Sequence, residues 1–213
     1  MCLTFLGTAA AEAYPDAFCS CENCSAARSL GGPSLRKRSA AIVNDDLLID
    51  FGPDLLAAAM IHDVPLTRVR YCLLTHEHGD HLDPSHFSAR LDACGPDDPS
   101  HLDFYATEGA LRTAAARLGA NLPADGLHDS RVAERFKLTA HAVAPFESLA
   151  IGPYRVTSLL ANHGSGAIVP LVYVIEQEGR SLFYCTDTGP LPEETWRALR
   201  ALPGPIHIVA LDH

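Results

Sequence analysis

The sequence is poor in basic residues and lacks a long apolar run. Sixteen Lys and Arg side chains stand against 26 Asp and Glu, which gives a formal net charge of −10. Because a phosphate backbone repels such a chain at long range, this balance disfavours general nucleic-acid binding. No segment reaches the roughly 18 apolar residues of a membrane span, and the first basic residue, Arg28, comes too late for a secretory signal. We therefore expect a cytoplasmic protein without a membrane partner.

What the chain does contain is enough apolar material for one packed core. Of its 213 residues, 47% are hydrophobic and 20% are charged, a balance typical of a folded globular protein. We expect a single domain over residues 1–213. The seven cysteines are an odd number, and in a reducing compartment we interpret them as thiols or metal ligands and not as disulfides.

Short apolar runs alternate with helical patterns along the chain and predict a mixed α/β (α+β) sandwich with helices covering the sheet faces. Residues 2–6, 39–43 and 47–51 should form strands of one sheet, with a hairpin at 44–46. Further predicted strands are residues 69–74, 102–106, 154–160, 172–176, 181–185 and 206–211, and predicted helices are 53–62, 108–118 and 193–201. Three of these strands each present a His or Asp to the loop that follows, which is a common way to build a site on a rigid scaffold.

Residues 75–81 read Thr-His-Glu-His-Gly-Asp-His and follow a predicted buried strand. Imidazole and carboxylate groups suit divalent transition metals, and two ions held close together can share a water molecule. Because alternate positions of an extended loop point the same way, His76 and His78 can share one ion while Asp80 and His81 turn toward another. The alternative, a solvated polar turn, explains one histidine but not three histidines and an aspartate within six residues.

This motif resembles the His-x-His-x-Asp-His signature of the metallo-β-lactamase superfamily. The resemblance implies a four-layer αββα sandwich and two divalent ions, zinc or manganese. It also implies that His163 completes the first ligand trio and that Asp187 bridges both ions. Asp50 looks like the family's buried carboxylate that orients a ligand histidine. Taken alone, His163 could be a loop histidine and Asp187 a turn or cap residue.

The end of the chain departs from the family pattern. In the family, one more histidine after a further strand and helix usually completes the second site, whereas this chain stops at His213 directly after a predicted strand. His207 lies within that strand and is interpreted as a packed or edge residue. Either the last C-terminal elements are missing, which we favour, or Asp80, His81 and Asp187 hold the second ion with water. The general acid stays open, with the missing tail and His213 as the two alternatives.

Cys19, Cys21 and Cys24 lie within six residues of an irregular segment at about 15–38, close enough for one structural zinc that still needs a fourth ligand. Unrelated thiols are the alternative. The spacing resembles the phosphoribosyl 1,2-cyclic phosphate phosphodiesterase branch of the superfamily, in which the fourth ligand is a histidine near the C-terminus. A similar cysteine loop occurs in pyrroloquinoline quinone biosynthesis protein B.

The resemblance therefore implies a metal-dependent hydrolase, and we expect it to act on a small or cyclic phosphodiester through a hydroxide that bridges the two ions. Asp80 would position that water as well as bind metal. An RNA-processing nuclease is one alternative, although residues 36–38 form the only basic run. A non-hydrolytic accessory protein of cofactor biosynthesis is the other. The native metal stays open, as does a homodimer.

Overall fold

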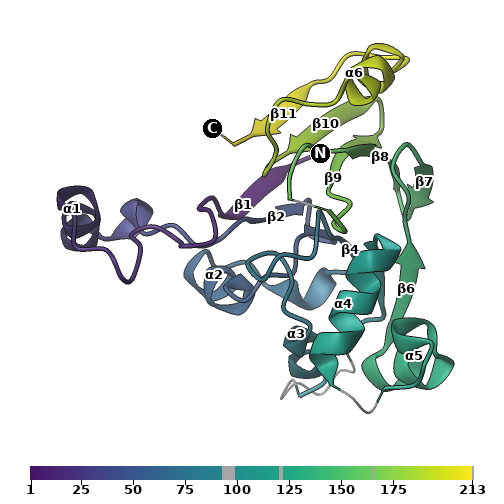
Figure 1. Ribbon diagram of the computed structural model, residues 1–213, viewed down its shortest axis with the longest axis horizontal. Coiled ribbons are helices and arrows are strands. Elements are labelled where there is room, and N and C mark those ends of the chain that lie inside the picture. The colour runs from purple at the N-terminus through teal and green to yellow at the C-terminus, as the bar shows by residue number, and fades with distance from the viewer. Residues whose placement is uncertain (93–98, 120–121, 165, 213) are drawn as a thin grey trace.

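The computed structural model describes residues 1–92, 99–119, 122–164 and 166–212, so His213 lies outside the described residues. Two β-sheets stack face to face (Figure 1). The first has six strands in the order β1 (Leu3–Gly7), β2 (Ala40–Val43), β3 (Leu47–Ile49), β4 (Tyr71–Leu73), β5 (Leu102–Ala106) and β6 (Leu138–Ala142). The second has five, in the order β11 (Ile208–Leu211), β10 (Arg180–Cys185), β9 (Leu171–Gln177), β8 (Tyr154–Leu160) and β7 (Ser148–Ile151).

Strand direction decides which chain segments meet at one edge of the sandwich. Strands β3, β4, β5 and β6 run parallel, so their carboxyl ends lie at the same edge of the first sheet. In the second sheet, β8 and β10 are both antiparallel to β9 and therefore run in the same direction as each other. The segments after β3, β4, β8 and β10 carry the predicted His and Asp residues of the two-metal site.

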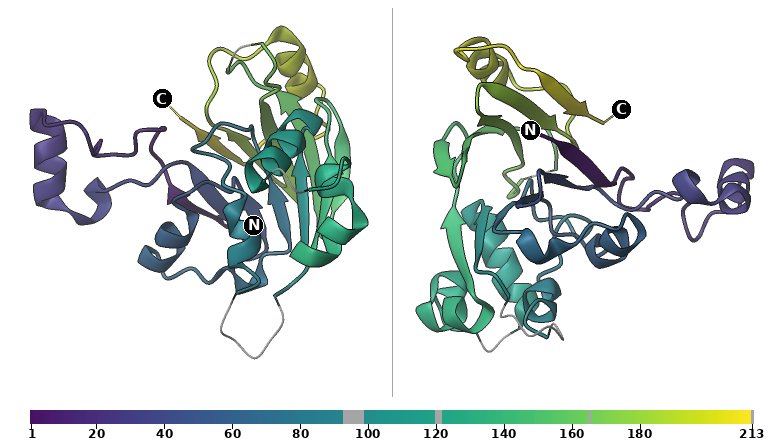
Figure 2. Two further views of the ribbon diagram at one scale, coloured as in Figure 1. Left: turned by 60° about the horizontal axis from the view of Figure 1, so that its bottom comes forward. Right: turned by 180° about the vertical axis from the view of Figure 1, so that it is seen from behind.

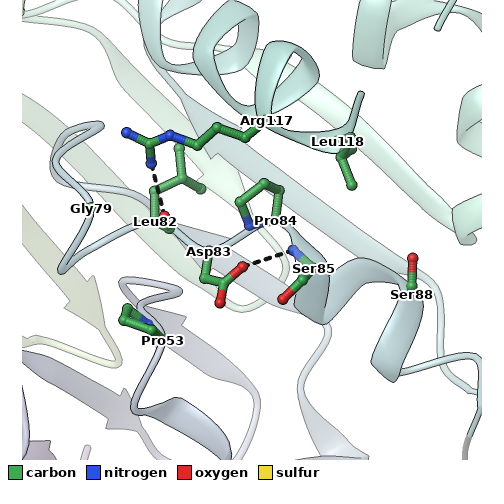
Figure 3. A pocket seen from close by; sticks show the side chains of 9 residues that line it. All are labelled: Pro53, Gly79, Leu82, Asp83, Pro84, Ser85, Ser88, Arg117 and Leu118. Carbon is green, nitrogen blue, oxygen red and sulfur yellow. Dashed lines mark hydrogen bonds between the residues drawn. The ribbon is translucent and has the colours of Figure 1, made fainter. Parts of the chain in front are cut away.

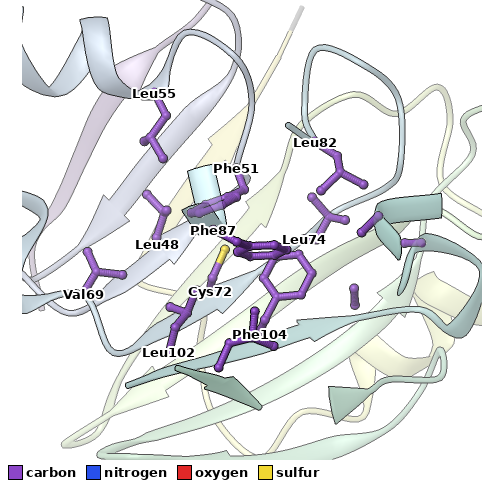
Figure 4. Close-up of a cluster of buried hydrophobic side chains, with 14 of the residues drawn as sticks. Leu48, Phe51, Leu55, Val69, Cys72, Leu74, Leu82, Phe87, Leu102 and Phe104 are labelled. Carbon is purple, nitrogen blue, oxygen red and sulfur yellow. The ribbon is translucent and has the colours of Figure 1, made fainter. Parts of the chain in front are cut away.

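Alternating side chains on each strand fill two separate core layers. On β9, Tyr173 and Ile175 face the first sheet, whereas Val172 and Val174 pack toward α6 (Glu193–Arg200) on the opposite face. On the outer face of the first sheet, buried side chains pack under α2 (Leu55–Ile61), α3 (Ser85–Ala89), α4 (Glu108–Leu118) and α5 (Ser130–Phe136) (Figure 4). The order is helix, sheet, sheet, helix, which confirms the predicted αββα sandwich.

The cysteine segment departs from the prediction. Instead of an irregular stretch, residues Glu22–Leu30 form helix α1, and Cys21 caps it by accepting a hydrogen bond from the backbone N–H of Cys24. This segment projects from the two sheets (Figures 1 and 2). Short 3₁₀ helices occupy Gly32–Ser34, Leu66–Arg68 and Gly126–His128. Within the described ranges, no helix has the length and apolar character needed to cross a bilayer.

The remaining differences concern short elements. Strands β6 and β7 and helices α3 and α5 were not predicted, whereas the predicted bounds of β5, α4 and β8 agree with the structure. The predicted strands 47–51 and 69–74 are shorter in the structure, since β3 ends at Ile49 and β4 extends only from Tyr71 to Leu73. Asp50 adopts a positive φ of 68°, a conformation that ends the strand and turns the chain toward the site.

Candidate metal centre

Two strand ends bring the predicted ligands of the first metal site together. The motif segment after β4 supplies His76 and His78, and the segment after β8 supplies His163. Nε2 of His76 lies 2.9 Å from Nδ1 of His78, and Nε2 of His163 lies 3.1 Å from the same atom. Two nitrogen ligands of a tetrahedral zinc lie about 3.3 Å apart, since each Zn–N bond is about 2.0–2.1 Å. The three nitrogens are therefore spaced for one ion.

The hydrogen-bond network assigns the proton on His76. The hydroxyl of Thr75 donates to Oδ1 of Asp50 over 2.8 Å, so its oxygen is left to accept from Nδ1–H of His76 over 3.1 Å. A neutral His76 then presents the lone pair of Nε2 to His78 and His163. Burial and the nearby charge of His81 lower the pKa of His76 to about 4, which keeps the ring neutral at pH 7. Converging lone pairs favour a bound cation.

A second group lies beside the first. Nε2 of His81 is 2.8 Å from Oδ2 of Asp187 and 3.3 Å from Oδ2 of Asp80. The same oxygen of Asp187 lies 3.6 Å from Nε2 of His76 and 3.8 Å from Nε2 of His163. One carboxylate oxygen thus faces nitrogens of both groups, which is the position required of a ligand that bridges two ions.

Asp50 fixes the orientation of the His81 ring. Its side chain is fully buried, and Oδ2 accepts a hydrogen bond from Nδ1–H of His81 over 2.8 Å. Oδ1 accepts from both the backbone N–H and the hydroxyl of Thr75. Because Nδ1 is committed to Asp50, Nε2 of His81 is the atom left to face Asp80 and Asp187.

The acidic groups are strongly ionised. Burial opposes the charge on Asp80, but the hydrogen bond and positive charge of His81 outweigh it and lower the pKa of Asp80 to about 2. The hydrogen bond from His81 likewise lowers the pKa of Asp187, against the effect of burial. Burial disfavours the charged form of His81, yet the charge of Asp50 and the hydrogen bond with Asp187 raise its pKa to about 12. A divalent ion would take the place of that proton.

Sequence reasoning missed the contacts that tie the two distant loops to each other. The backbone N–H of Asn162 donates to the hydroxyl of Thr188 over 2.9 Å, and the N–H of Gly189 donates to the carbonyl of Asn162 over 2.8 Å. Asp212 accepts a hydrogen bond from the backbone N–H of Asp187. These bonds fix the loops of His163 and Asp187 relative to each other. The sequence carries no local signal for them.

Cys19, Cys21 and Cys24 form a separate group whose sulfur atoms all lie within 4.8 Å of one another. Hydrogen bonding from the backbone N–H of Cys24 lowers the pKa of the Cys21 thiol, whereas burial raises that of Cys24. Three thiolates at this spacing suit zinc, which takes a fourth ligand in structural sites.

The structure thus brings together the residues predicted for each site, and their binding of metal stays a prediction. His207 lies apart from them. Its Nδ1 accepts a hydrogen bond from the N–H of Ser181, at the end of β10 opposite to Asp187.

Comparison with known proteins identifies the family. A family model described as "Beta-lactamase superfamily domain" matches residues 46–210. No curated protein matches the chain. Zinc-bound PqqB from Methylobacterium extorquens is similar in structure, with a TM-score of 0.69 and 17% identity over 99% of this chain and 72% of that one. A diphosphatase of the PhnP family gives a TM-score of 0.64 and 19% identity over 94% of this chain and 70% of that one.

The short form of human tRNase Z is more distant, with a TM-score of 0.50 and 18% identity over 85% of this chain and 67% of that one. At such identities these likenesses show the fold. The family model covers most of the chain, and the superfamily that it describes consists largely of hydrolytic enzymes. The chain belongs to the β-lactamase superfamily, as the motif at residues 75–81 predicted.

Proposed function

We propose that this protein hydrolyses a small or cyclic phosphodiester with the help of two divalent ions, zinc or manganese. The observation that carries the proposal is the position of Asp187, whose Oδ2 lies 2.8 Å from Nε2 of His81 and 3.6 Å from Nε2 of His76. One carboxylate between two groups of nitrogen ligands suits a pair of ions, and paired ions are a recurrent feature of phosphodiester hydrolysis. We also propose a cytoplasmic location, following the sequence expectation.

Two bound ions would activate a water molecule for attack on phosphorus and neutralise the charge of the phosphoryl oxygens. The chain's own residues prepare the site for that chemistry. Neutral His76 offers Nε2 as a ligand, because its Nδ1–H is held by Thr75. Asp80 is ionised at neutral pH and, like Asp187, lies beside Nε2 of His81, so its carboxylate can orient a water molecule.

The net charge of the chain favours a small substrate. The chain carries a net charge of −10, so a long polyanion is repelled everywhere except at the bound ions. Residues 36–38 form the only basic run in the sequence, and two of its side chains contact other residues of the chain. Arg36 lies over the ring of Tyr14 at 5.1 Å, and Nε of Arg38 lies 3.8 Å from Asp54. A small diester therefore fits better than RNA.

The test is hydrolysis of bis(p-nitrophenyl) phosphate by protein loaded with manganese or zinc. We expect metal-dependent turnover that falls by more than about 100-fold in His78→Ala, beyond the 10–100-fold typical for residues that only support a ligand. His62→Ala, which removes an exposed histidine outside the site, is the matched control and should keep full activity.

Two results would contradict the proposal. Absence of metal-dependent turnover in the wild-type protein would favour a non-hydrolytic accessory role instead. Faster cleavage of a structured RNA than of any small diester would favour the nuclease alternative.

A further inference from the structure

Arg117, in the last turn of α4, reaches the segment that carries the motif. Its Nη2 donates to the carbonyl oxygen of Glu77 over 2.8 Å, and its Nη1 donates to the carbonyl oxygen of Leu82 over 2.9 Å. These two residues border the stretch 78–81, which contains His78, Asp80 and His81. One guanidinium thus joins the beginning and the end of the loop that supplies half of the predicted ligands.

Arg117 lies beside a cavity. A cavity of about 570 Å³ lies between this loop, α3 and the end of α4, and Gly79, Leu82 and Arg117 are among its lining residues (Figure 3). A side chain added at Gly79 would meet nothing within 4 Å, so packing from this side does not hold the tip of the loop. Hydrogen bonds must therefore supply the restraint that side-chain contacts do not.

The two carbonyl groups belong to buried residues, since Glu77 is 9% exposed and Leu82 is 2% exposed. A buried carbonyl without a hydrogen-bond partner destabilises the fold, which favours the conformation that Arg117 satisfies. A planar guanidinium presents its N–H groups in a fixed fork, so it sets the separation of the two carbonyls as well as their direction.

The other end of α4 also contacts the motif. A Cβ at Gly109, in the first turn, would lie 3.4 Å from Oε1 of Glu77, so the buried Glu77 carboxylate lies against the start of this 11-residue helix. Oε2 of Glu77 has no hydrogen-bond partner among the described residues. The partial positive charge of a helix N-terminus stabilises such a carboxylate. Glu77 thus lies near the first turn of α4 with its side chain and is hydrogen-bonded to the last turn through its carbonyl oxygen.

We propose that Arg117 is a positioning residue of the metal centre, which fixes the separation of Glu77 and Leu82 and thereby the geometry of His78, Asp80 and His81. The inference rests on the metal site proposed above and adds a residue that the motif does not contain. Both hydrogen bonds printed for Arg117 among the described residues end on backbone carbonyl oxygens, so it acts through the backbone of the loop.

The experiment compares Arg117→Met and Arg117→Lys with a control on the same helix. Arg112→Met is matched, because Arg112 pairs with Glu108 at 3.4 Å on the surface and does not reach the loop. Zinc dissociation constants are measured by competition with a chromophoric chelator, and cobalt-substituted proteins are compared by their visible d–d absorption, which reports ligand geometry. Neither measurement needs a substrate.

For Arg117→Met we expect zinc binding that is about 10–100-fold weaker and an altered cobalt spectrum, as for other groups that support metal ligands. Arg117→Lys should fall between Met and wild type, because a lysine keeps the charge but not the planar fork. Arg112→Met should match the wild type.

The inference is overturned if Arg117→Met binds zinc with wild-type affinity and gives an unchanged cobalt spectrum. Should Arg117→Met not fold, Arg117→Lys decides, and a lysine variant identical to wild type in both measurements overturns the inference equally. A wild-type protein that binds zinc but hydrolyses no diester would defeat the proposed function alone, since affinity and spectrum are measured without turnover.

Discussion

Oδ2 of Asp50 lies 2.8 Å from Nδ1 of His81, and both side chains are almost completely excluded from solvent. This pair joins the carboxyl end of β3 to the motif segment that follows β4. Because a buried carboxylate fixes both the tautomer and the orientation of the imidazole, the pair decides which atom of His81 is presented to a metal ion.

Asp50→Asn should weaken zinc binding by about 10–100-fold while the overall fold is kept. The amide preserves the shape of the side chain but no longer stabilises a positively polarised His81 ring. Chelator competition measures the dissociation constant. Asp45→Asn is the control, because Asp45 pairs with Arg68 on the surface at 3.1 Å. Equal zinc affinity in wild type and Asp50→Asn would exclude an orienting role for Asp50.

Zinc affinity should rise with pH. In the metal-free protein, burial disfavours a charge on His81, but the charge of Asp50 and the hydrogen bond with Asp187 raise its pKa from 6.5 to about 12. Zinc must displace the Nε2 proton, so one proton leaves on binding and affinity grows by up to about tenfold per pH unit. Calorimetry in buffers of different ionisation enthalpy measures the proton released. A binding constant that does not depend on pH would contradict this account.

The metal-free protein should show the opposite trend in stability. Since the pKa of His81 is raised, its contribution is complete below pH 6.5 and is lost as the pH rises toward 12. The pKa of Asp80 is lowered from 3.8 to about 2, so its contribution is present above pH 3.8 and is lost as the pH falls toward 2. Thermal unfolding in a chelator should therefore give the highest Tm near pH 6.5, because the lowered pKa of His76, about 4, also removes stability as the pH falls from 6.5 toward 4. A metal-free Tm that climbs steadily from pH 6 to 9 would argue against the charged pair.

The thiol of Cys21 should react much faster than the thiols buried in the core. Hydrogen bonding from Cys24 lowers the pKa of Cys21, which is exposed, whereas burial raises the pKa of Cys185 to about 12. Because the thiolate is the reactive form, iodoacetamide at pH 7.5 should modify Cys21 well before Cys185. Added zinc should protect Cys19, Cys21 and Cys24 together, as mass spectrometry of the peptides would show. Unchanged labelling with zinc would leave these residues as unrelated thiols.

Phe87→Ala tests the packing of the hydrophobic core on the outer face of the first sheet. Phe87 is fully buried, and its ring lies 5.1 Å from that of Phe51 and 5.2 Å from that of Phe104. The substitution should lower the free energy of unfolding by about 3–5 kcal/mol, because it leaves a cavity in a packed core. Phe18→Ala, at a fully exposed site, is the control and should change it by less than about 0.5 kcal/mol. Equal effects in urea unfolding would show that the packing is wrong.

The core of the site was predictable because its signals are local. Residues 75–81 place their imidazoles and carboxylate within one loop, and His163 and Asp187 each lie in the loop that follows a strand. Strands β9 and β10 carry apolar side chains that fill both faces, which makes them recognisable as buried strands.

The supporting contacts were not predictable, because each joins residues far apart in the chain. Arg117 lies 40 positions from Glu77 and 35 from Leu82, and nothing around it distinguishes it from other helix arginines. Asp212 accepts a hydrogen bond from the backbone N–H of Asp187, which lies 25 positions away. Strand β7 is largely exposed at the edge of its sheet and lacks a clear apolar alternation, and α5 has only seven residues. Such elements depend on tertiary packing more than on local propensity.

The central claim is that two cations bind side by side between these loops. The most direct measurement is an anomalous-scattering map of crystals grown with zinc or manganese, together with elemental analysis of the same protein. The account predicts one peak among His76, His78 and His163 and a second beside Asp80, His81 and Asp187. A map with no peak at either position, in protein that retains its fold, would contradict it.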